Sequence, residues 1–356
     1  MPNRLVAKLP PIPHSRPWIT EEDVRAVARV VRSGMLAQGT ETAAFEREMG
    51  DSLGLPPGVA VSSGTAALHL ALLGLGVGAG DEVILPSYLC VAPLHAIEYV
   101  GARARLADID PLTYNLDSRD VRRNVTKRTR AIIVPHLFGL PADMDSLLAL
   151  DVPLVEDCAQ ALGATLDGRP VGGFGTVGTL SFYATKLLAT GEGGMVVSRD
   201  PKLLARLRDL RDYDERRCHQ VRYNYKLTDI QAALGRSQLK RFPRMLARRR
   251  GIALQYAQHL GDLAARLPQT DGRRMHAYHR FVVRTPGSAS ALARQIEALG
   301  VHARPPIFQP LHVTLGLDGF PGASDAYRHA LSLPIYPNLR KEEEAAVIRA
   351  MRSILS

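Results

Sequence analysis

Short apolar runs alternate with segments of helical periodicity through the first half of the chain. The runs VAVSSG, DEVILPS, RARLADID, AIIVPH and PLVED begin at residues 59, 81, 103, 131 and 153, and each has the length of a buried strand. Segments of helical spacing lie between them, such as TAALHLALLGLG and a stretch near 92–100. Because strands and helices alternate, the pattern predicts an α/β fold with a mostly parallel sheet.

The segment before the first strand predicts a capped helix. Thr20 and Asp23 have the spacing of a capping box, and Gly34 stands where a helix can end. The apolar positions between them repeat at helical spacing: Val24, Val27, Ala28 and Val31.

The alternation of short strands and helices gives way to long helical stretches near Leu227. Two long helical stretches, LTDIQAALGRSQLKRF and RMLARRRGIALQYAQHLGDLAARL, precede the short strand YHRFVVRT and the helix SALARQIEALG. This order predicts a second, smaller α/β unit. We therefore expect a large domain with an N-terminal arm at residues 1–240 and a small C-terminal domain at 241–356.

Composition limits the class of protein. The 356 residues are 46% hydrophobic and 22% charged, as expected for a globular protein. No apolar run is long enough to cross a membrane, and the first residues lack the apolar core of a signal peptide, so we expect a cytoplasmic protein with no membrane partner. Cys90, Cys158 and Cys218 form no CxxC pair, which argues against structural zinc and a disulfide framework. We expect no bound metal.

A formal net charge of +10 allows either a nucleic acid or a small anion as partner. The basic clusters at 122–130, 206–217 and 248–250 are not interleaved with aromatic residues as a nucleic-acid platform would be. Solvated helix faces explain these clusters most simply. We therefore expect anionic small-molecule substrates and no nucleic acid.

Four loops adjoin predicted strands: SSGT, PSYLC, EDCAQ and the turn that contains Lys186. In an open α/β sheet, ligands bind in loops at the carboxyl ends of the strands, so we expect these loops to share one site. Gly64 and Thr65 open a helix, where free amide groups attract an anion such as phosphate. A plain helix cap would have the same sequence.

Two further side chains add chemistry to these loops. Glu156 and Asp157 end an apolar run, where a carboxylate can pair with a ring cation or simply satisfy backbone amides. Lys186 lies on a non-helical turn followed by glycines; most lysines are surface charges, but a lysine with a depressed pKa is a nucleophile. A phosphate cup, a carboxylate for a pyridinium nitrogen and a Schiff-base lysine together are what pyridoxal 5'-phosphate requires.

The chain resembles the DegT/DnrJ/EryC1/StrS family of sugar aminotransferases. The resemblance is carried, in the family's order and over nearly the whole chain, by FEREM, SSGTAALHLAL, GDEVILPS, LADIDPLTYNLD, EDCAQALGA, SFYATK with GEGGMVV, YNYKLTDIQAALGRSQL and PLH. It implies the type I fold of PLP-dependent transferases, with a mostly parallel mixed sheet in the large domain and a smaller C-terminal α/β domain.

The resemblance also implies roles for single residues. Lys186 would form the Schiff base and shuttle the proton, Asp157 would pair with the pyridine nitrogen, and Gln160 would contact the 3′ oxygen of the ring. The cofactor phosphate would be bound by the amides of Gly64 and Thr65 and by the hydroxyl of Ser181.

Asn224 matches an asparagine that reaches the phosphate from a partner subunit, so the resemblance implies a homodimer with shared sites.

Two segments depart from the family. Cys90 stands where many members have an aromatic residue stacked on the ring, with Tyr88 two residues earlier, and the loop 301–312 contains PIF where members often have HYP. In relatives this loop faces the sugar.

The reaction implied is transfer of an amino group from an amino acid, most often L-glutamate, to a keto-sugar linked to a nucleoside diphosphate. A dehydratase branch has histidine in place of the lysine, and an iron–sulfur branch needs more cysteines, so Lys186 and the cysteine count favour amino transfer. Arg222, Lys226 and Arg304 could meet the diphosphate or be plain surface charges.

Two alternatives stay open at this stage. The altered 301–312 loop would also suit an aminotransferase acting on a non-nucleotide substrate, such as a keto-cyclitol or an aminoglycoside precursor. The positive charge would suit a non-catalytic regulator or nucleic-acid binder with a retired PLP fold. The intact Lys186, Asp157 and Ser181 argue against the second alternative.

Overall fold

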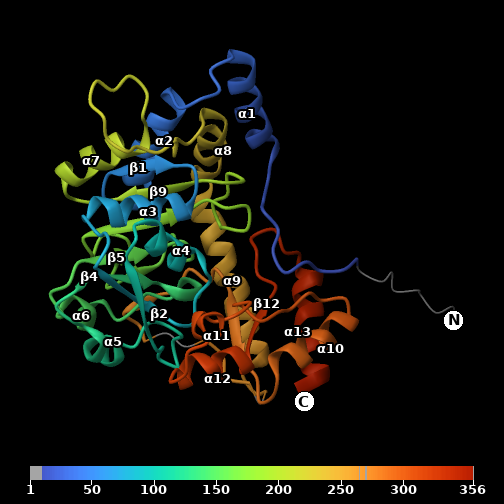
Figure 1. The fold of residues 1–356 in the computed structure, drawn as a ribbon. Coiled ribbons are helices and arrows are strands. Elements are labelled where there is room, and N and C mark those ends of the chain that lie inside the picture. The colour runs from blue at the N-terminus through green and yellow to red at the C-terminus, as the bar shows by residue number, and fades with distance from the viewer. Residues whose placement is uncertain (1–9, 264, 269–270, 356) are drawn as a thin grey trace.

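Seven strands form the central sheet of the computed structural model, which describes residues 10–263, 265–268 and 271–355 (Figure 1). Their order across the sheet is β1 (Gly58–Val61), β9 (Gly194–Val197), β8 (Val177–Ser181), β5 (Leu154–Asp157), β4 (Thr129–Pro135), β2 (Glu82–Pro86) and β3 (Arg103–Ala107). Only β9 runs antiparallel to its neighbours, while β8, β5, β4, β2 and β3 pair in parallel. The predicted mostly parallel α/β fold is confirmed.

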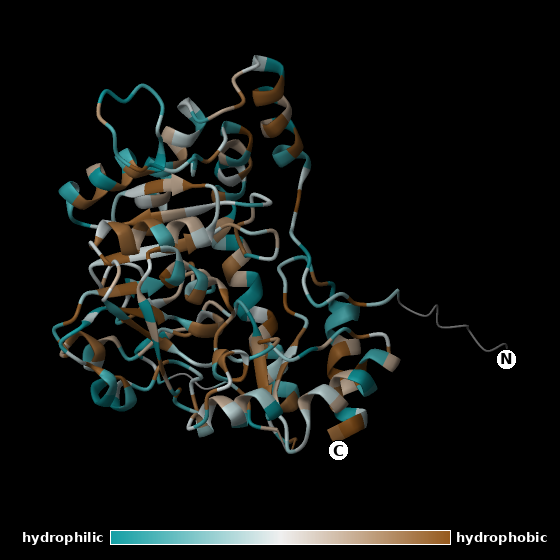
Figure 2. Cartoon of the chain, in the orientation of Figure 1, coloured by the Kyte–Doolittle hydropathy of each residue, from teal (hydrophilic) through white to brown (hydrophobic). Residues whose placement is uncertain are grey.

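Both faces of this sheet are buried under helices, and alternate residues of a strand face opposite layers. Along β4, Ile133 packs with one face and Ile132 with the other. One face packs against α3 (Gly64–Gly74), α4 (Ala92–Tyr99) and α7 (Pro201–Arg211), and the other against α2 (Thr40–Leu53), α5 (Ser118–Asn124), α6 (Met144–Leu148) and α8 (Asp229–Leu239). The central strands are accordingly hydrophobic over most of their length (Figure 2), whereas the edge strand β3 carries Arg103 and Arg105.

A second core lies beyond the sheet. Strand β11 (Phe281–Arg284) pairs antiparallel with β12 (Ala330–Leu333), and α10 (Ala289–Ala298) and α13 (Lys341–Leu355) pack with them. The long helix α9 (Phe242–Leu260) joins both cores, because its first turns pack with the α2 and α8 side and its later turns with β11. The division at residues 240 and 241 stays a prediction.

The remaining elements are short. A small sheet is formed by β10 (Arg274–Met275), β6 (Thr165–Leu166) and β7 (Arg169–Pro170), and η1 (Leu137–Gly139) follows β4. Helices α11 (Leu311–Leu315) and α12 (Pro321–His329) return to the α3 and α4 side of the sheet. Within the described residues, no helix is long and apolar enough to cross a membrane.

Helix α1 (Glu21–Ser33) has the predicted ends. The Thr20 amide donates to the carboxylate of Asp23 at 2.8 Å, and Gly34 ends the helix at φ +75°. The apolar face of this helix is only partly buried, since Val24 and Val31 are 52% and 53% exposed. The periodicity therefore predicted the helix correctly, but not what covers its face.

The start of α2 is held by a carboxylate from a distant part of the sequence. Asp229 is buried and accepts hydrogen bonds from the amides of Gly39, Glu41 and Thr42 at 2.8, 3.1 and 2.9 Å, and from the Thr42 hydroxyl at 2.7 Å. The amides at a helix N-terminus have no partner within the helix, so this carboxylate both satisfies them and ties α2 to α8.

We expect Asp229→Ala to lower the free energy of unfolding by about 2 kcal/mol or more, because several buried donors lose their acceptor. Urea denaturation followed by circular dichroism measures the change. Asp51→Ala on the exposed end of α2 is the matched control and should stay within about 0.5 kcal/mol of the parent chain. Equal stabilities of the two variants would contradict the role of Asp229.

Candidate active site

The four loops meet at the carboxyl edge of the sheet, around a cavity of about 310 Å³. Its wall includes one or more residues from each predicted loop: Ser63, Gly64, Thr65, Cys90, Asp157, Ser181 and Lys186. The prediction that these loops share one site is thus supported by the geometry.

Two larger clefts of about 540 and 620 Å³ lie elsewhere on the molecule. In the first, each arginine is paired with an acid: Arg119 with Asp117, Arg273 with Asp145 and Arg274 with Asp271. In the second, Glu82 pairs with Arg128. Neither cleft is lined by a lysine, as the smaller cavity is.

Lys186 stands on a turn between two antiparallel strands. Its amide donates to the Tyr183 carbonyl at 2.8 Å, and the Phe182 amide donates to the Gly193 carbonyl at 2.8 Å. Gly193 adopts φ +152°, and a Cβ there would meet the Thr190 hydroxyl at 2.6 Å, which explains the glycines after the lysine. Burial lowers the pKa of Lys186, the nearby Asp157 acts against this, and Arg280 adds to it.

Glu156 and Asp157 point to opposite sides because successive strand residues alternate. Glu156 is fully buried and accepts from the amides of Gly172, Phe174 and Gly175 at 2.7, 2.7 and 2.6 Å. Asp157 lies on the cavity wall, accepts one bond from the Ala159 amide at 3.0 Å, and has its pKa raised by burial. Of the two carboxylates, Glu156 satisfies the backbone and Asp157 faces the site.

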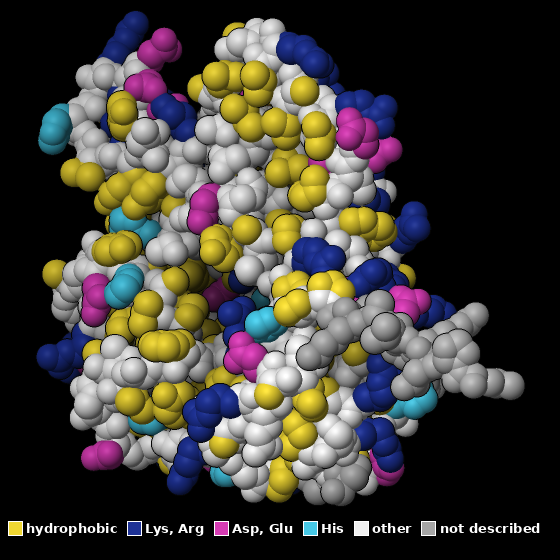
Figure 3. Space-filling view, turned by 90° about the vertical axis from the view of Figure 1, so that its right-hand side faces the viewer, with side chains coloured by type: hydrophobic (Ala, Val, Ile, Leu, Met, Phe, Trp, Pro, Cys, Tyr) yellow, Lys and Arg dark blue, Asp and Glu magenta, His cyan; other side chains and the backbone are white. Residues whose placement is uncertain are grey.

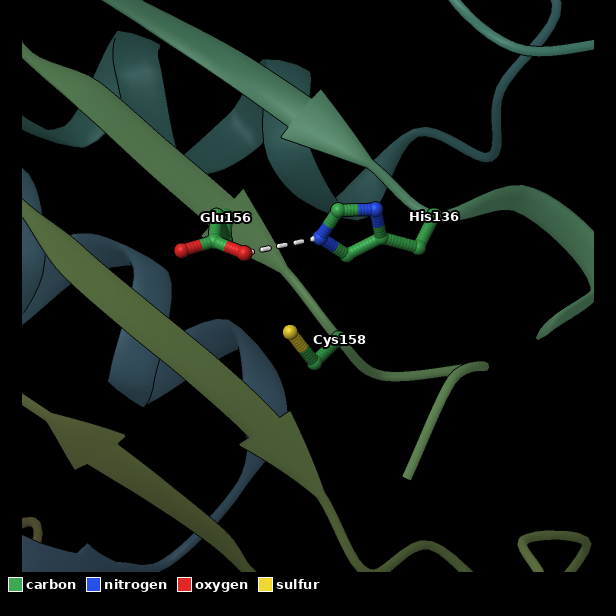
Figure 4. Close-up of side chains that lie close together, drawn as sticks. All are labelled: His136, Glu156 and Cys158. Atoms are coloured by element: carbon green, nitrogen blue, oxygen red, sulfur yellow. Dashed lines mark hydrogen bonds and ion pairs between the residues drawn. The ribbon is translucent and has the colours of Figure 1, made fainter. Parts of the chain in front are cut away.

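Beside Glu156 lies a buried cluster with His136 and Cys158 (Figure 4). The His136 Nε2 contacts Glu156 at 3.0 Å, while its Nδ1 accepts from the Ala142 amide at 3.0 Å. Nδ1 is therefore the hydrogen-bond acceptor, and Nε2 carries the hydrogen and donates it in the hydrogen bond to Glu156. Both ring nitrogens are in use, so this cluster is a hydrogen-bond network rather than a set of free metal ligands.

The start of α3 forms one end of the cavity. The Ser63 side chain caps the helix by accepting from the Ala66 amide at 3.0 Å. The amides of Gly64 and Thr65 have no partner one helical turn back and lie on the cavity wall. A Cβ on Gly64 would come within 2.9 Å of the Ser181 Cβ, so glycine is needed for the close approach of α3 to β8.

Gln160, Cys90 and Tyr88 differ in whether their side chains line a cavity. Gln160 lines a small adjoining cavity with Lys186, and its side-chain oxygen accepts from the Phe138 amide at 3.1 Å. Cys90 lies on the main cavity wall, whereas Tyr88 is buried in the core and donates its hydroxyl to the Ala326 carbonyl. Of these two, only Cys90 is placed to meet a ligand.

Asn224 is exposed and does not line the cavity of its own chain. Its neighbours Tyr223 and Tyr225 stack their rings on each other and contact His69, and the Tyr225 hydroxyl lies 3.1 Å from the His69 Nδ1. Within a single chain, the structure does not bring Asn224 to the other predicted residues.

The three cations suggested for a diphosphate also differ. Arg222 pairs with Asp209, and Lys226 pairs with Asp212 and Asp214. Arg304 is exposed, and among the described residues it has no ion pair.

Sequence reasoning missed His279 and Arg280 at this edge. His279 lines the small cavity next to Lys186. The Ala277 amide donates to the Gly139 carbonyl at 2.9 Å and the Arg280 amide to the Phe138 carbonyl at 3.2 Å, so the segment 277–280 docks beside the end of β4. No local pattern shows this docking; the only signal is a pair of polar residues at the start of the predicted strand YHRFVVRT.

Residues 17–352 match the DegT/DnrJ/EryC1/StrS aminotransferase family, and the chain belongs to this family. It is therefore an aminotransferase, an enzyme that transfers nitrogenous groups. The suspected family and enzyme class are confirmed.

Curated and solved relatives agree over nearly their full lengths. The GDP-perosamine synthase of Caulobacter vibrioides is 36% identical over 331 residues, 87% of this chain and 89% of that protein. The UDP-N-acetyl-3-dehydro-alpha-D-glucosamine 3-aminotransferase of Acidithiobacillus ferrooxidans is 34% identical over 353 residues, 95% of each. The crystal structure of S. venezuelae DesV in complex with a ketimine intermediate has a TM-score of 0.91 at 34% identity, covering 97% of this chain and 99% of that one.

The burial of Lys186 and its nearness to Asp157 predict how its amine titrates in protein that carries no aldehyde or ketone bound to the lysine. Acetylation of Lys186 should set in at lower pH than for a free lysine side chain, whose pKa is about 10.4. Asp157→Asn should shift this profile to still lower pH, because it removes the carboxylate that favours the charged amine. Mass spectrometry across a pH series measures both profiles.

The exposed Lys127 in the same samples is the control and should give the same profile in both proteins. An Asp157→Asn profile that is unchanged, or shifted to higher pH, would show that Asp157 does not act on Lys186.

Proposed function

We propose that this aminotransferase moves an amino group from an amino acid, with L-glutamate as the donor, to a keto-sugar linked to a nucleoside diphosphate, and that it uses pyridoxal 5'-phosphate. The observation that carries the proposal is the meeting of Lys186, Asp157, Ser181 and the N-terminus of α3 around one cavity.

The residues of the cavity fit this cofactor. The first-turn amides of Gly64 and Thr65 and the Ser181 hydroxyl lie on one wall of the cavity and suit a phosphate. A Cβ on Gly64 would collide with Ser181, so glycine keeps these donors close together. Asp157 suits a protonated ring nitrogen and Lys186 suits an aldehyde, with Gln160 and Cys90 beside them. When bound, pyridoxal phosphate supplies an aldehyde that takes up amino groups and a ring that withdraws electrons from the substrate carbon.

The chain's own groups then have defined tasks. The lowered pKa of Lys186 makes its neutral form more available than that of a free lysine, so its Nζ can accept a proton and return it. Burial raises the pKa of Asp157, and a cation held against it favours the ionised form, so the carboxylate and a positive ring nitrogen stabilise each other. The helix N-terminus binds and orients the phosphate without moving a proton.

The substrate class rests on the relatives. Two of them are named for GDP-linked and UDP-linked sugars. An anionic substrate suits a chain of net charge +10, and Arg304 is a cation left free of ion pairs within the described residues. These points favour a nucleotide-linked sugar over a keto-cyclitol.

Asn224 is assigned to the site of a partner subunit. It is exposed, its neighbouring tyrosines are held by their own chain, and it does not reach the cavity next to it. A symmetric dimer would place each Asn224 at the phosphate end of the other cavity, because an isologous interface makes every contact twice.

Lys186→Ala should abolish nearly all turnover and the visible or near-ultraviolet absorbance that borohydride removes, since no other amine lines the main cavity among the described residues. Absorbance spectra and a glutamate assay with keto-sugar nucleotides measure the two effects. Lys127→Ala is the matched control and should behave as the parent. Full turnover by Lys186→Ala would refute the proposed function.

Mixing two inactive chains tests the shared site. Lys186→Ala combined with Asn224→Asp should regain activity once subunits exchange, because one site of each mixed dimer keeps both residues. Activity after mixing and refolding at equal amounts measures this, with each variant alone as control. Failure to complement, when exchange is shown by differently tagged chains, would remove Asn224 from the partner's site.

A further inference from the structure

Four aromatic side chains pack together beside Asn224. The rings of Tyr223 and Tyr225, on either side of it in the chain, stack with their centroids 5.1 Å apart. The ring of His69 on α3 meets them edge to face at 4.8 and 5.9 Å, and Tyr99 of α4 meets His69 in the same way at 5.5 Å. His69, Tyr99, Tyr223 and Tyr225 thus form an aromatic cluster that joins α3 to the segment carrying Asn224.

The backbone on both sides of Asn224 is also held by its own chain. The Tyr223 amide donates to the Leu210 carbonyl at 2.9 Å, and the Tyr225 carbonyl accepts from the Ser62 amide at 2.8 Å. Successive side chains of an extended segment point to opposite sides. Because Tyr223 and Tyr225 both face His69, the residue between them projects the other way, and Asn224 is exposed.

A histidine is an unusual residue at this position of α3. It is the only ionisable side chain of the helix, it is buried, and its Nε2 has no hydrogen-bond partner. An apolar side chain would fill the same place without leaving a buried polar atom unsatisfied. What His69 supplies instead is a hydrogen bond between its Nδ1 and the Tyr225 hydroxyl, at 3.1 Å, and a flat ring against which the tyrosines pack. Its contacts therefore serve the segment 223–225 rather than the helix.

We infer that His69 is a positioning residue that holds Asn224 in place for the cavity of the partner subunit; this inference rests on the proposed function. Helix α3 then has two tasks. Its first amides line the cavity of its own chain, while His69 fixes the segment that the chain lends to the other cavity.

The surface around the cluster suits contact with a second copy. Tyr99, its most exposed member, is 59% exposed. Hydrophobic side chains also form several patches on the face of the molecule drawn in Figure 3. Exposed apolar surface of this kind marks contacts with other proteins, and a partner whose cavity meets Asn224 would cover some of it.

Mixed dimers of differently tagged chains test which cavity His69 serves, because a dimer with one Lys186→Ala chain has a single site with a lysine. In the first dimer, a His69→Ala chain pairs with a Lys186→Ala chain. Its lysine site receives Asn224 from the chain with His69 intact, so turnover should match that of a parent chain paired with Lys186→Ala.

In the second dimer, a parent chain pairs with a chain that carries both His69→Ala and Lys186→Ala. The lysine site now receives Asn224 from the chain without His69. Its turnover should fall roughly 10- to 100-fold below the same reference, because a small displacement of a binding group has an effect of this size. If His69 served only the cavity of its own chain, the first dimer would lose activity and the second would not.

Hydrogen–deuterium exchange of the cofactor-free protein, measured by mass spectrometry, reports the positioning without turnover. In His69→Ala the amides of residues 223–225 should exchange roughly tenfold faster than in the parent, while those of residues 66–68 on α3 keep their rates. His69→Phe keeps a ring and loses the hydrogen bond, so its exchange should lie between. His259→Asn, on the exposed side of α9, is the matched control and should exchange as the parent does.

Equal activity of the two mixed dimers overturns the inference, as does a loss confined to the first dimer or unchanged exchange at residues 223–225. If His69→Ala does not fold, His69→Phe takes its place in both dimers and should give the same order with a smaller loss. If Lys186→Ala and Asn224→Asp chains exchange but do not complement, the shared site of the proposed function fails. If they complement while the two mixed dimers are equally active, only the role of His69 fails.

Discussion

The active edge of this enzyme depends on the hydrogen bonds of one buried carboxylate, Glu156. Its two oxygens take up the amides of the turn 172–175 and the His136 side chain, and so they fix the end of β5 between the end of β4 and the entry to β8. With Glu156 turned inward, strand alternation turns Asp157 toward the cavity. The same register lets β8 end at Ser181, from which the turn presents Lys186.

Much of the fold could be predicted because parallel strands buried on both faces must be apolar throughout. The runs that became β2, β4 and β5 are mostly of this kind, whereas the edge strand β3 carries two arginines. The bounds of β8 and β9, which flank the Lys186 turn, could not be given for a physical reason: they are short and glycine-containing, and Gly178 and Gly194 are required by backbone that approaches within 2.6 and 2.3 Å of where a Cβ would stand. Such crowding belongs to the tertiary structure and leaves only a glycine in the sequence.

The site residues also separate into those set by local sequence and those set by tertiary contacts. The meeting of Gly64, Asp157 and Lys186 at one cavity could be predicted because each stands at its own strand end, turn or helix start, whereas Ser181 was named from the family resemblance. His279 could not be predicted, since it reaches the small cavity beside Lys186 through a docking contact between segments 277–280 and 138–139, which no periodicity encodes. Asn224 was named from family resemblance alone, and its exposure in one chain is what a residue destined for another subunit would show.

Charge ties these parts together around the lysine. Asp157 favours the charged form of Lys186, whereas burial and Arg280 favour the neutral form. A cation held against Asp157 would weaken the influence of that carboxylate on the amine, and burial would then favour proton release from Lys186. The carboxylate that is proposed to pair with the ring nitrogen would in this way also govern the protonation of the reacting amine.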